Sequence, residues 1–146
     1  AYEIRPRDWS SDVCSSDLGT TYTDTGLAPG SYTWSVAALD AAGNASPAAT
    51  VSFTVPQPDT TAPTAPGNLR IASLTTTRVS LAWNAATDDR GVAGYRVYRN
   101  GVLLATVTTL SYSSSRTKAQ ATYEVYAYDA AGNVSPVSNS VVVAAR

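Results

Sequence analysis

The sequence of 146 residues contains no histidine, no methionine, one cysteine and one lysine. Without histidine, the chain lacks the most frequent general base and the most frequent metal ligand of proteins. Its formal charge of −1 provides no basic field for a nucleic acid. No apolar run approaches the roughly 18 residues of a membrane helix. We therefore expect no nucleic-acid partner and no membrane segment, and the missing initiator methionine predicts an internal piece of a longer protein.

The residues that are present in quantity are those of strands and turns. Threonine, valine, serine and tyrosine are plentiful, together with 9 glycines and 8 prolines. β-Branched and aromatic side chains favour strands, whereas glycine and proline favour turns. The composition therefore predicts an all-β protein.

An almost identical octapeptide occurs twice in the chain. Residues 40–47 read DAAGNASP and residues 129–136 read DAAGNVSP, an offset of 129 − 40 = 89 residues. This offset is about the length of one small β-sandwich module. Only 39 residues precede the first octapeptide, so we expect the first copy to lack its front and the second copy to be complete.

Residues 1–18 differ in style from everything that follows. Residues 8–18, DWSSDVCSSDL, show no alternation and contain the only cysteine, Cys14. They closely resemble the translation of a common short-read sequencing adapter; residues 1–4 fit the same adapter, and residues 5–7 fall where a sample barcode would lie. We interpret residues 1–18 as an assembly artefact rather than a native segment. Cysteine content then leaves the redox compartment open.

Residues 19–55 have the pattern of the last strands of a sandwich. Residues 21–23 read as the end of a short strand, and residues 26–30 read as a turn. Two alternating strands follow, joined by a hairpin loop over residues 41–47 in which Gly43 is expected to be left-handed. Their apolar positions are Tyr32, Trp34, Val36, Ala38, Val51, Phe53 and Val55.

A proline-rich segment separates the two copies. Residues 56–66, PQPDTTAPTAP, contain four prolines and no large apolar residue. Such spacing favours an extended, semi-rigid chain. We therefore expect a linker over residues 56–66 and the complete module over residues 67–146.

The second copy predicts seven short strands. Polar and apolar residues alternate in it, and Asn100-Gly101 is the signal for a tight hairpin. The last strand is expected over residues 137–143. Seven short strands joined by frequent turns indicate a Greek-key sandwich. The expected inward positions are Leu69, Ile71, Val79, Leu81, Trp83, Tyr95, Val97, Tyr123, Val125 and Ala127.

These residues carry a family resemblance. Residues 88–101, DDRGVAGYRVYRNG, followed by AAGN at residues 130–133, resemble the bacterial fibronectin type III module. Trp83 lies where that family has its core tryptophan. The resemblance covers residues 64–146 as a whole module and residues 19–55 as the C-terminal part of a preceding one. It implies an immunoglobulin-like Greek-key sandwich.

The resemblance also implies a function. Bacterial modules of this family link or space the domains of secreted chitinases, cellulases and other polysaccharide hydrolases. It therefore implies a non-catalytic extracellular spacer whose partners are the neighbouring domains of the same chain, with no cofactor. Tyr32 resembles the family's tyrosine corner, and the matching position of the second copy is Ala121, which cannot form that hydroxyl-to-backbone bond.

Catalytic and metal-binding patterns are weak. Ser115 and Lys118 match the Ser-x-x-Lys motif of acyl transfer, which needs a helix, whereas they fall in a predicted loop. Asp88 and Asp89 are adjacent, and neighbouring side chains of an extended chain point to opposite sides. They are expected to shape a turn rather than to face one substrate as a glycosidase pair does. Calcium binding by Asp88, Asp89 or Asp129 would need a convergent ligand set, so we expect no catalytic and no metal site.

One candidate binding feature remains, the tyrosine face formed by Tyr98, Tyr126 and Tyr128. By alternation, these side chains face away from the core on two strands that pair in this fold. Exposed aromatic rings can stack on sugar rings or on a protein partner. The alternative is cross-strand pairing, which stabilises a sheet by about 0.2–1 kcal/mol per pair. Two functions stay open: a spacer, or a polysaccharide- or cell-surface-binding module that uses the tyrosine face.

Overall fold

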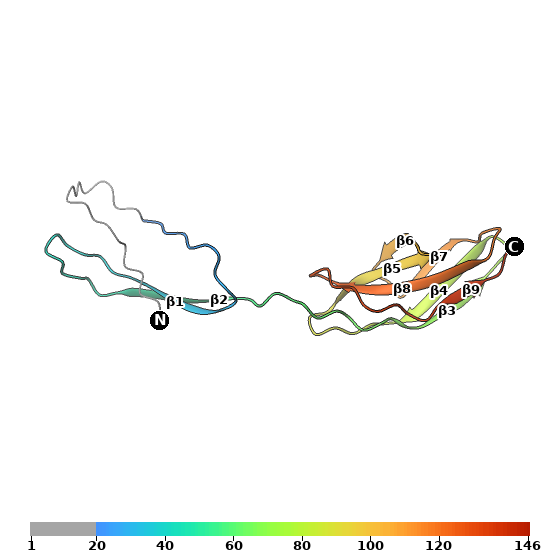
Figure 1. Ribbon diagram of the computed structural model, residues 1–146, viewed down its shortest axis with the longest axis horizontal. Helices are drawn as coiled ribbons and strands as arrows, with labels where there is room; N and C mark the ends of the chain where they lie inside the picture. Colours follow the sequence, from blue (N-terminus) through green and yellow to red (C-terminus); the bar gives the residue numbers. More distant parts are fainter. Residues whose placement is uncertain (1–19) are drawn as a thin grey trace. The chain divides into compact units, whose positions relative to one another are not determined.

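The computed structural model describes residues 20–146, in which there are nine strands and no helix (Figure 1). The chain divides into two compact units between Pro58 and Asp59. The predictions made for residues 1–18 lie outside the described residues.

The first unit contains one antiparallel hairpin of β1 (Gly30–Val36) and β2 (Ala49–Val55). The loop between them is held by Asp40, whose Oδ1 accepts hydrogen bonds from the backbone N–H groups of Ala42 and Asn44 at 3.0 and 2.8 Å. Gly43 has φ 85°, as predicted. Residues 21–23 were expected to end a strand, and this prediction is wrong because no described segment pairs with them.

Aromatic residues gather on one face of this hairpin. The ring of Phe53 stacks on Tyr32 with 5.7 Å between centroids and meets Trp34 edge-on at 5.1 Å. Val36 and Val51 lie on the same face but remain 71% and 57% exposed. The hairpin therefore carries an apolar face that is only partly covered. The Tyr32 hydroxyl donates to the Ala28 carbonyl at 2.7 Å, which confirms the expected corner.

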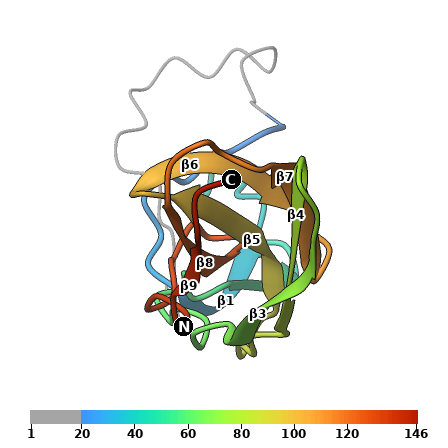
Figure 2. The ribbon, with the colours of Figure 1, turned by 90° about the vertical axis from the view of Figure 1, so that its right-hand side faces the viewer.

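The second unit contains the other seven strands, in two antiparallel sheets that face each other (Figure 2). One sheet has the order β3-β4-β7 and the other β6-β5-β8-β9, so the predicted Greek-key sandwich of seven strands is confirmed. Asn100 and Gly101 have φ 51° and 77° in the tight turn between β5 and β6. The strands are β3 (Gly67–Leu74), β4 (Arg78–Asn84), β5 (Val92–Arg99), β6 (Val102–Val107), β7 (Ser111–Ser115), β8 (Ala121–Asp129) and β9 (Val141–Val143).

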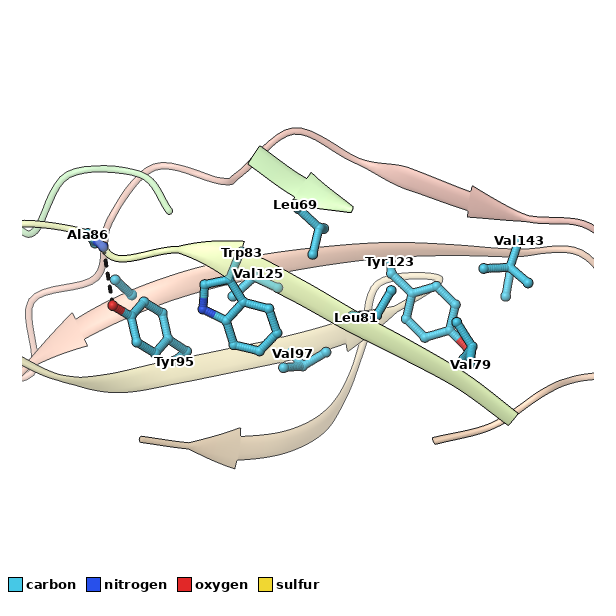
Figure 3. Close-up of a cluster of buried hydrophobic side chains, with 12 residues drawn as sticks. Leu69, Val79, Leu81, Trp83, Ala86, Tyr95, Val97, Tyr123, Val125 and Val143 are labelled. Carbon is cyan, nitrogen blue, oxygen red and sulfur yellow. Dashed lines mark hydrogen bonds between the residues drawn. The ribbon is translucent and has the colours of Figure 1, made fainter. Parts of the chain in front are cut away.

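The core lies between the two sheets (Figure 3). Leu81 and Trp83 of β4 face Val97 of β5 and Tyr123 of β8 within one buried cluster. Buried and half-buried residues alternate along the whole of β8, as the period of two predicts. Nine of the ten expected inward positions are buried. The exception is Ile71, which is 36% exposed although it pairs with the buried Leu81; β3 has register shifts on both sides of this pair.

The end of the chain differs from the expected strand over residues 137–143. Only Val141–Val143 pairs with β8 as a strand. Before it, the hydroxyls of Ser135 and Ser138 accept hydrogen bonds from the backbone N–H groups of Ala127 and Val125 at 2.8 and 3.0 Å. The backbone N–H groups of the same two serines donate to the carbonyls of Ala127 and Val125 at 2.9 and 3.0 Å, so each serine bonds β8 through its backbone and its side chain together.

Part of the expected linker lies on the second unit. Pro63 and Pro66 are fully buried, and the backbone N–H of Thr64 donates to the carbonyl of Thr87 at 2.8 Å. The second unit accordingly begins at Asp59, ahead of the expected start at residue 67. Proline spacing alone does not distinguish a free spacer from a segment that packs its rings on a sheet.

Candidate functional site

The three tyrosines of the tyrosine face lie on the outer side of the second unit's larger sheet. Tyr126 and Tyr128 alternate with the buried residues of β8, and Tyr98 lies on the neighbouring strand β5. All three are half-buried. The structure therefore brings together the residues that the sequence singled out, and their ring contacts decide what this face can bind.

Tyr128 packs against its own sheet. A Cβ added at Gly94, which lies opposite on β5, would be 2.7 Å from the Tyr128 hydroxyl oxygen. The Arg96 guanidinium lies over the Tyr128 ring, 4.9 Å from its centroid, which is a cation–π contact. A ring that rests on a glycine and carries a guanidinium over its face is held as part of the sheet.

Tyr98 and Tyr126 form a pair. Their ring centroids are 5.2 Å apart and their planes meet at 70°, the edge-to-face geometry that stabilises aromatic pairs. Two rings at this angle do not share a plane. The geometry of the tyrosine face thus fits cross-strand pairing within the sheet.

A cluster of acidic side chains lies elsewhere on this unit. One carboxylate oxygen from each of Asp59, Asp88 and Asp89 falls within 4.8 Å of the others. The expectation that Asp88 and Asp89 point to opposite sides is therefore wrong, because the two residues lie in a turn between β4 and β5 and not in a strand. Asp88 shapes this turn as expected: its Oδ2 accepts from the N–H groups of Arg90 and Gly91, both at 2.9 Å.

Asp59 is the acidic residue that sequence reasoning missed. It was assigned to the linker, yet it begins the second unit. Its carbonyl accepts a hydrogen bond from the side-chain amide of Asn133 at 3.3 Å, and its Oδ1 accepts from the N–H of Thr61 at 3.0 Å. No motif connects Asp59 to Asp88 in the sequence, because the contact depends on how the segment after Pro58 packs.

The Asp129 carboxylate accepts hydrogen bonds from the loop that follows it. It is buried, and its Oδ1 and Oδ2 accept from the backbone N–H and side-chain amide of Asn133 at 2.9 and 2.8 Å. Burial raises the pKa of Asp129. The hydrogen bonds from Asn133 and from the loop amides of Gly132 and Ala131 lower it by more, so the pKa lies below its ordinary value. The pKa of Asp40 in the first unit is also lowered, chiefly by the side chain of Asn44.

The serine and lysine of the acyl-transfer pattern form no such site. Ser115 ends β7 and Lys118 lies in the loop that follows, so neither is on a helix.

Among the described residues, no helix is long and apolar enough to cross a membrane.

Curated proteins with similar sequences are polysaccharide-degrading enzymes of bacteria. Chitinase A1 of Niallia circulans is 49% identical over 90% of this chain, exoglucanase B of Cellulomonas fimi 43% over 86%, and an α-amylase of Niallia circulans 40% over 94%. The chain spans only 20%, 12% and 11% of the lengths of these relatives. No protein-family model matches the sequence.

Solved structures agree with the observed fold. A chitinase, ChiA74 of Bacillus thuringiensis, is 30% identical over 61% of this chain and 14% of its own, with a TM-score of 0.55. The FN1–FN3 domains of chicken CNTN1 match 86% of this chain and 46% of their own at 19% identity, with a TM-score of 0.53. At 19% identity, the similarity to CNTN1 is evidence about the fold alone.

Proposed function

We propose that this chain, which has the fold of fibronectin type III domains, supplies non-catalytic spacer modules to a larger secreted bacterial glycoside hydrolase. One observation carries the proposal. A chitinase, an exoglucanase and an α-amylase each resemble this chain over a small part of their length. Enzymes named for different polysaccharides share this segment, so it contributes something other than the chemistry that distinguishes them. Because such polymers lie outside the cell, we place the chain there too, with neighbouring domains of the same protein as its partners.

Sequencing the source gene on both sides of this segment tests the proposal. We expect the same reading frame to encode a polysaccharide hydrolase domain with its own catalytic carboxylates. A continuous reading frame that encodes no hydrolase would overturn the proposal.

The same gene sequence decides on residues 1–18. We propose that they are a translated sequencing adapter, which is supported by the match of residues 8–18 and 1–4 to the adapter and by the break in pattern at residue 19. The α-amylase alignment covers 94% of the chain and so takes in part of residues 1–18. If the gene encodes residues 8–18, the artefact hypothesis is wrong and Cys14 is a native thiol.

We propose further that residues 19–55 are the C-terminal part of a module like the second unit. The Ser46 hydroxyl accepts from the Ala38 N–H at 3.0 Å, as Ser135 does from Ala127 at 2.8 Å, 89 residues on. By the same offset, Trp34 occupies the place of Tyr123, which is fully buried under the other sheet. Within residues 20–58, no second sheet covers the apolar face of the hairpin as one covers its counterpart. Residues 56–58 then remain as the linker proper, and residues 59–146 as the complete module.

The second candidate function is a polysaccharide- or cell-surface-binding module that uses the tyrosine face. It is favoured by the position of the half-buried Tyr98–Tyr126 pair on the outer side of a sheet. Pull-down of the chain on insoluble chitin and cellulose tests it, with Tyr98→Ala plus Tyr126→Ala as the variant. Tyr22→Ala, which removes a tyrosine that is 64% exposed on the first unit, is the control. Unchanged retention in the double variant would exclude this function.

A further inference from the structure

We propose that Asp59, Asp88 and Asp89 form a calcium site at the start of the second unit. One carboxylate oxygen from each residue lies within 4.8 Å of the other two. Carboxylates are the ligands that calcium prefers in proteins. Two of the residues come from the turn before β5, and the third is the first residue of the unit.

The spacing of the oxygens is compatible with calcium. Oxygens bound to one Ca²⁺ at about 2.3–2.6 Å can be up to about 5.2 Å apart, whereas oxygens bound to Mg²⁺ at about 2.0–2.1 Å can be no more than about 4.2 Å apart. The three oxygens lie within 4.8 Å of one another, which is inside the calcium range, and magnesium gives up its bound water less readily than calcium. Water and carbonyl oxygens would complete the six to eight ligands that calcium takes.

A second observation points to a ligand at the cluster. The two oxygens of Asp88 have different surroundings: Oδ2 accepts two backbone N–H groups of the turn. Oδ1 exposes less than 1 Å² and has no hydrogen-bond partner within the described part of the chain. A buried carboxylate oxygen without a partner is costly, and a bound cation at this place would satisfy it.

The site would link two segments that are distant in sequence. Asp59 accepts hydrogen bonds from Asn133 and Thr61, and the segment that it begins is bonded to the residue before Asp88 by the Thr64 N–H, which donates to the Thr87 carbonyl at 2.8 Å. Three negative charges this close repel one another when no cation is bound. Calcium would therefore fasten the beginning of the unit to the turn between β4 and β5, and would stabilise the folded state by binding to it and not to the unfolded chain.

Calorimetric titration of the chelator-treated chain with CaCl₂, paired with thermal unfolding in CaCl₂ and in EDTA, tests the site. We expect one ion to bind with a Kd of about 0.1–1 mM, the range of extracellular calcium modules. We also expect 10 mM CaCl₂ to raise Tm by several degrees, in line with mass action. MgCl₂ at the same concentration controls for ionic strength.

Asp89→Asn is the informative variant, because Asp89 is exposed and its removal leaves the turn bonds of Asp88 in place. It is expected to raise Kd about tenfold or more and to reduce the Tm shift by half or more, while Tm in EDTA stays the same or rises slightly because one repelling charge is removed. Asp24→Asn in the first unit is the matched control and should bind as the parent does. The proposal is overturned if no heat and no Tm shift appear, if MgCl₂ acts equally well, or if Asp89→Asn binds normally.

Discussion

The side-chain amide of Asn139 forms both of the hydrogen bonds that a paired strand would form with Leu69. Its Oδ1 accepts from the Leu69 N–H and its Nδ2 donates to the Leu69 carbonyl, both at 2.8 Å. Leu69 is 3% exposed and lies on β3, an edge strand of the smaller sheet. The Asn139 side chain thus replaces the hydrogen bonds of a paired strand, and it links the segment before β9 of the larger sheet to β3 of the smaller sheet.

Asn139→Ala is expected to lower the free energy of unfolding of the second unit by about 1–3 kcal/mol, because it leaves the N–H and carbonyl of Leu69 without partners. Asn139→Asp should cost at least as much, since it keeps the acceptor for the Leu69 N–H but sets a carboxylate oxygen against the Leu69 carbonyl, where the amide donated. Urea denaturation measures both, with the exposed Ser140→Ala as control. Equal stability of Asn139→Ala and the control would show that these bonds contribute nothing.

Gly94 makes room for Tyr128. A Cβ at this position would lie 2.7 Å from the Tyr128 hydroxyl and 2.9 Å from the Val107 carbonyl, closer than real Cβ atoms approach. Gly94→Ala is therefore expected to destabilise the unit by about 1–3 kcal/mol through overpacking. Adding Tyr128→Phe should recover part of the loss, because it removes one of the two close atoms. A Gly94→Ala protein as stable as the parent by thermal unfolding would contradict this packing.

The lowered pKa of Asp129 predicts how stability depends on pH. A carboxyl group whose pKa is lower in the folded state stabilises fully above its unfolded value, near 3.8, and this contribution is lost as the pH falls through the folded value. The free energy of unfolding should therefore hold between pH 7 and about 5 and decline below about pH 4. Asp129→Asn should flatten the decline, whereas Asp24→Asn in the other unit should not. A decline of the same steepness in Asp129→Asn would disprove the assignment.

The two units should differ in resistance to protease. The hairpin of β1 and β2 is a two-stranded sheet with an incompletely covered apolar face, and isolated hairpins are marginally stable. Residues 59–146 have a buried core between two sheets. Limited proteolysis followed by mass spectrometry should find early cuts within residues 20–58 and an intact fragment beginning near Asp59. Equal resistance of both parts would contradict the proposal that residues 19–55 lack a facing sheet.

Much of the fold could be predicted from the sequence because it depends on local patterns. Alternation placed Leu81, Trp83 and Val125 in the core, and Asn100-Gly101 marked its turn. The errors arose where tertiary contacts replace local rules. Residues 137–140 were expected to belong to the last strand, yet Ser138 bonds Val125 through both its backbone N–H and its hydroxyl instead of through regular strand pairing. Pro63 has the sequence context of a linker but is buried in the second unit.

For the candidate sites, too, local sequence patterns could be interpreted, whereas tertiary contacts could not be predicted. Alternation alone placed Tyr98, Tyr126 and Tyr128 on one outer face, but it could not indicate that Tyr128 rests on Gly94. The acidic cluster was out of reach, because Asp59 lies 29 residues before Asp88 (88 − 59 = 29) and meets it only through packing of the segment between Pro58 and β3.

We propose that this chain adds no catalytic chemistry of its own. Incubating the purified chain with colloidal chitin, amorphous cellulose and soluble starch, and measuring reducing sugar over time, tests it most directly. We expect sugar release to equal the protein-free blank on all three substrates. Release that rises in proportion to protein concentration, and persists through a second purification step, would contradict it.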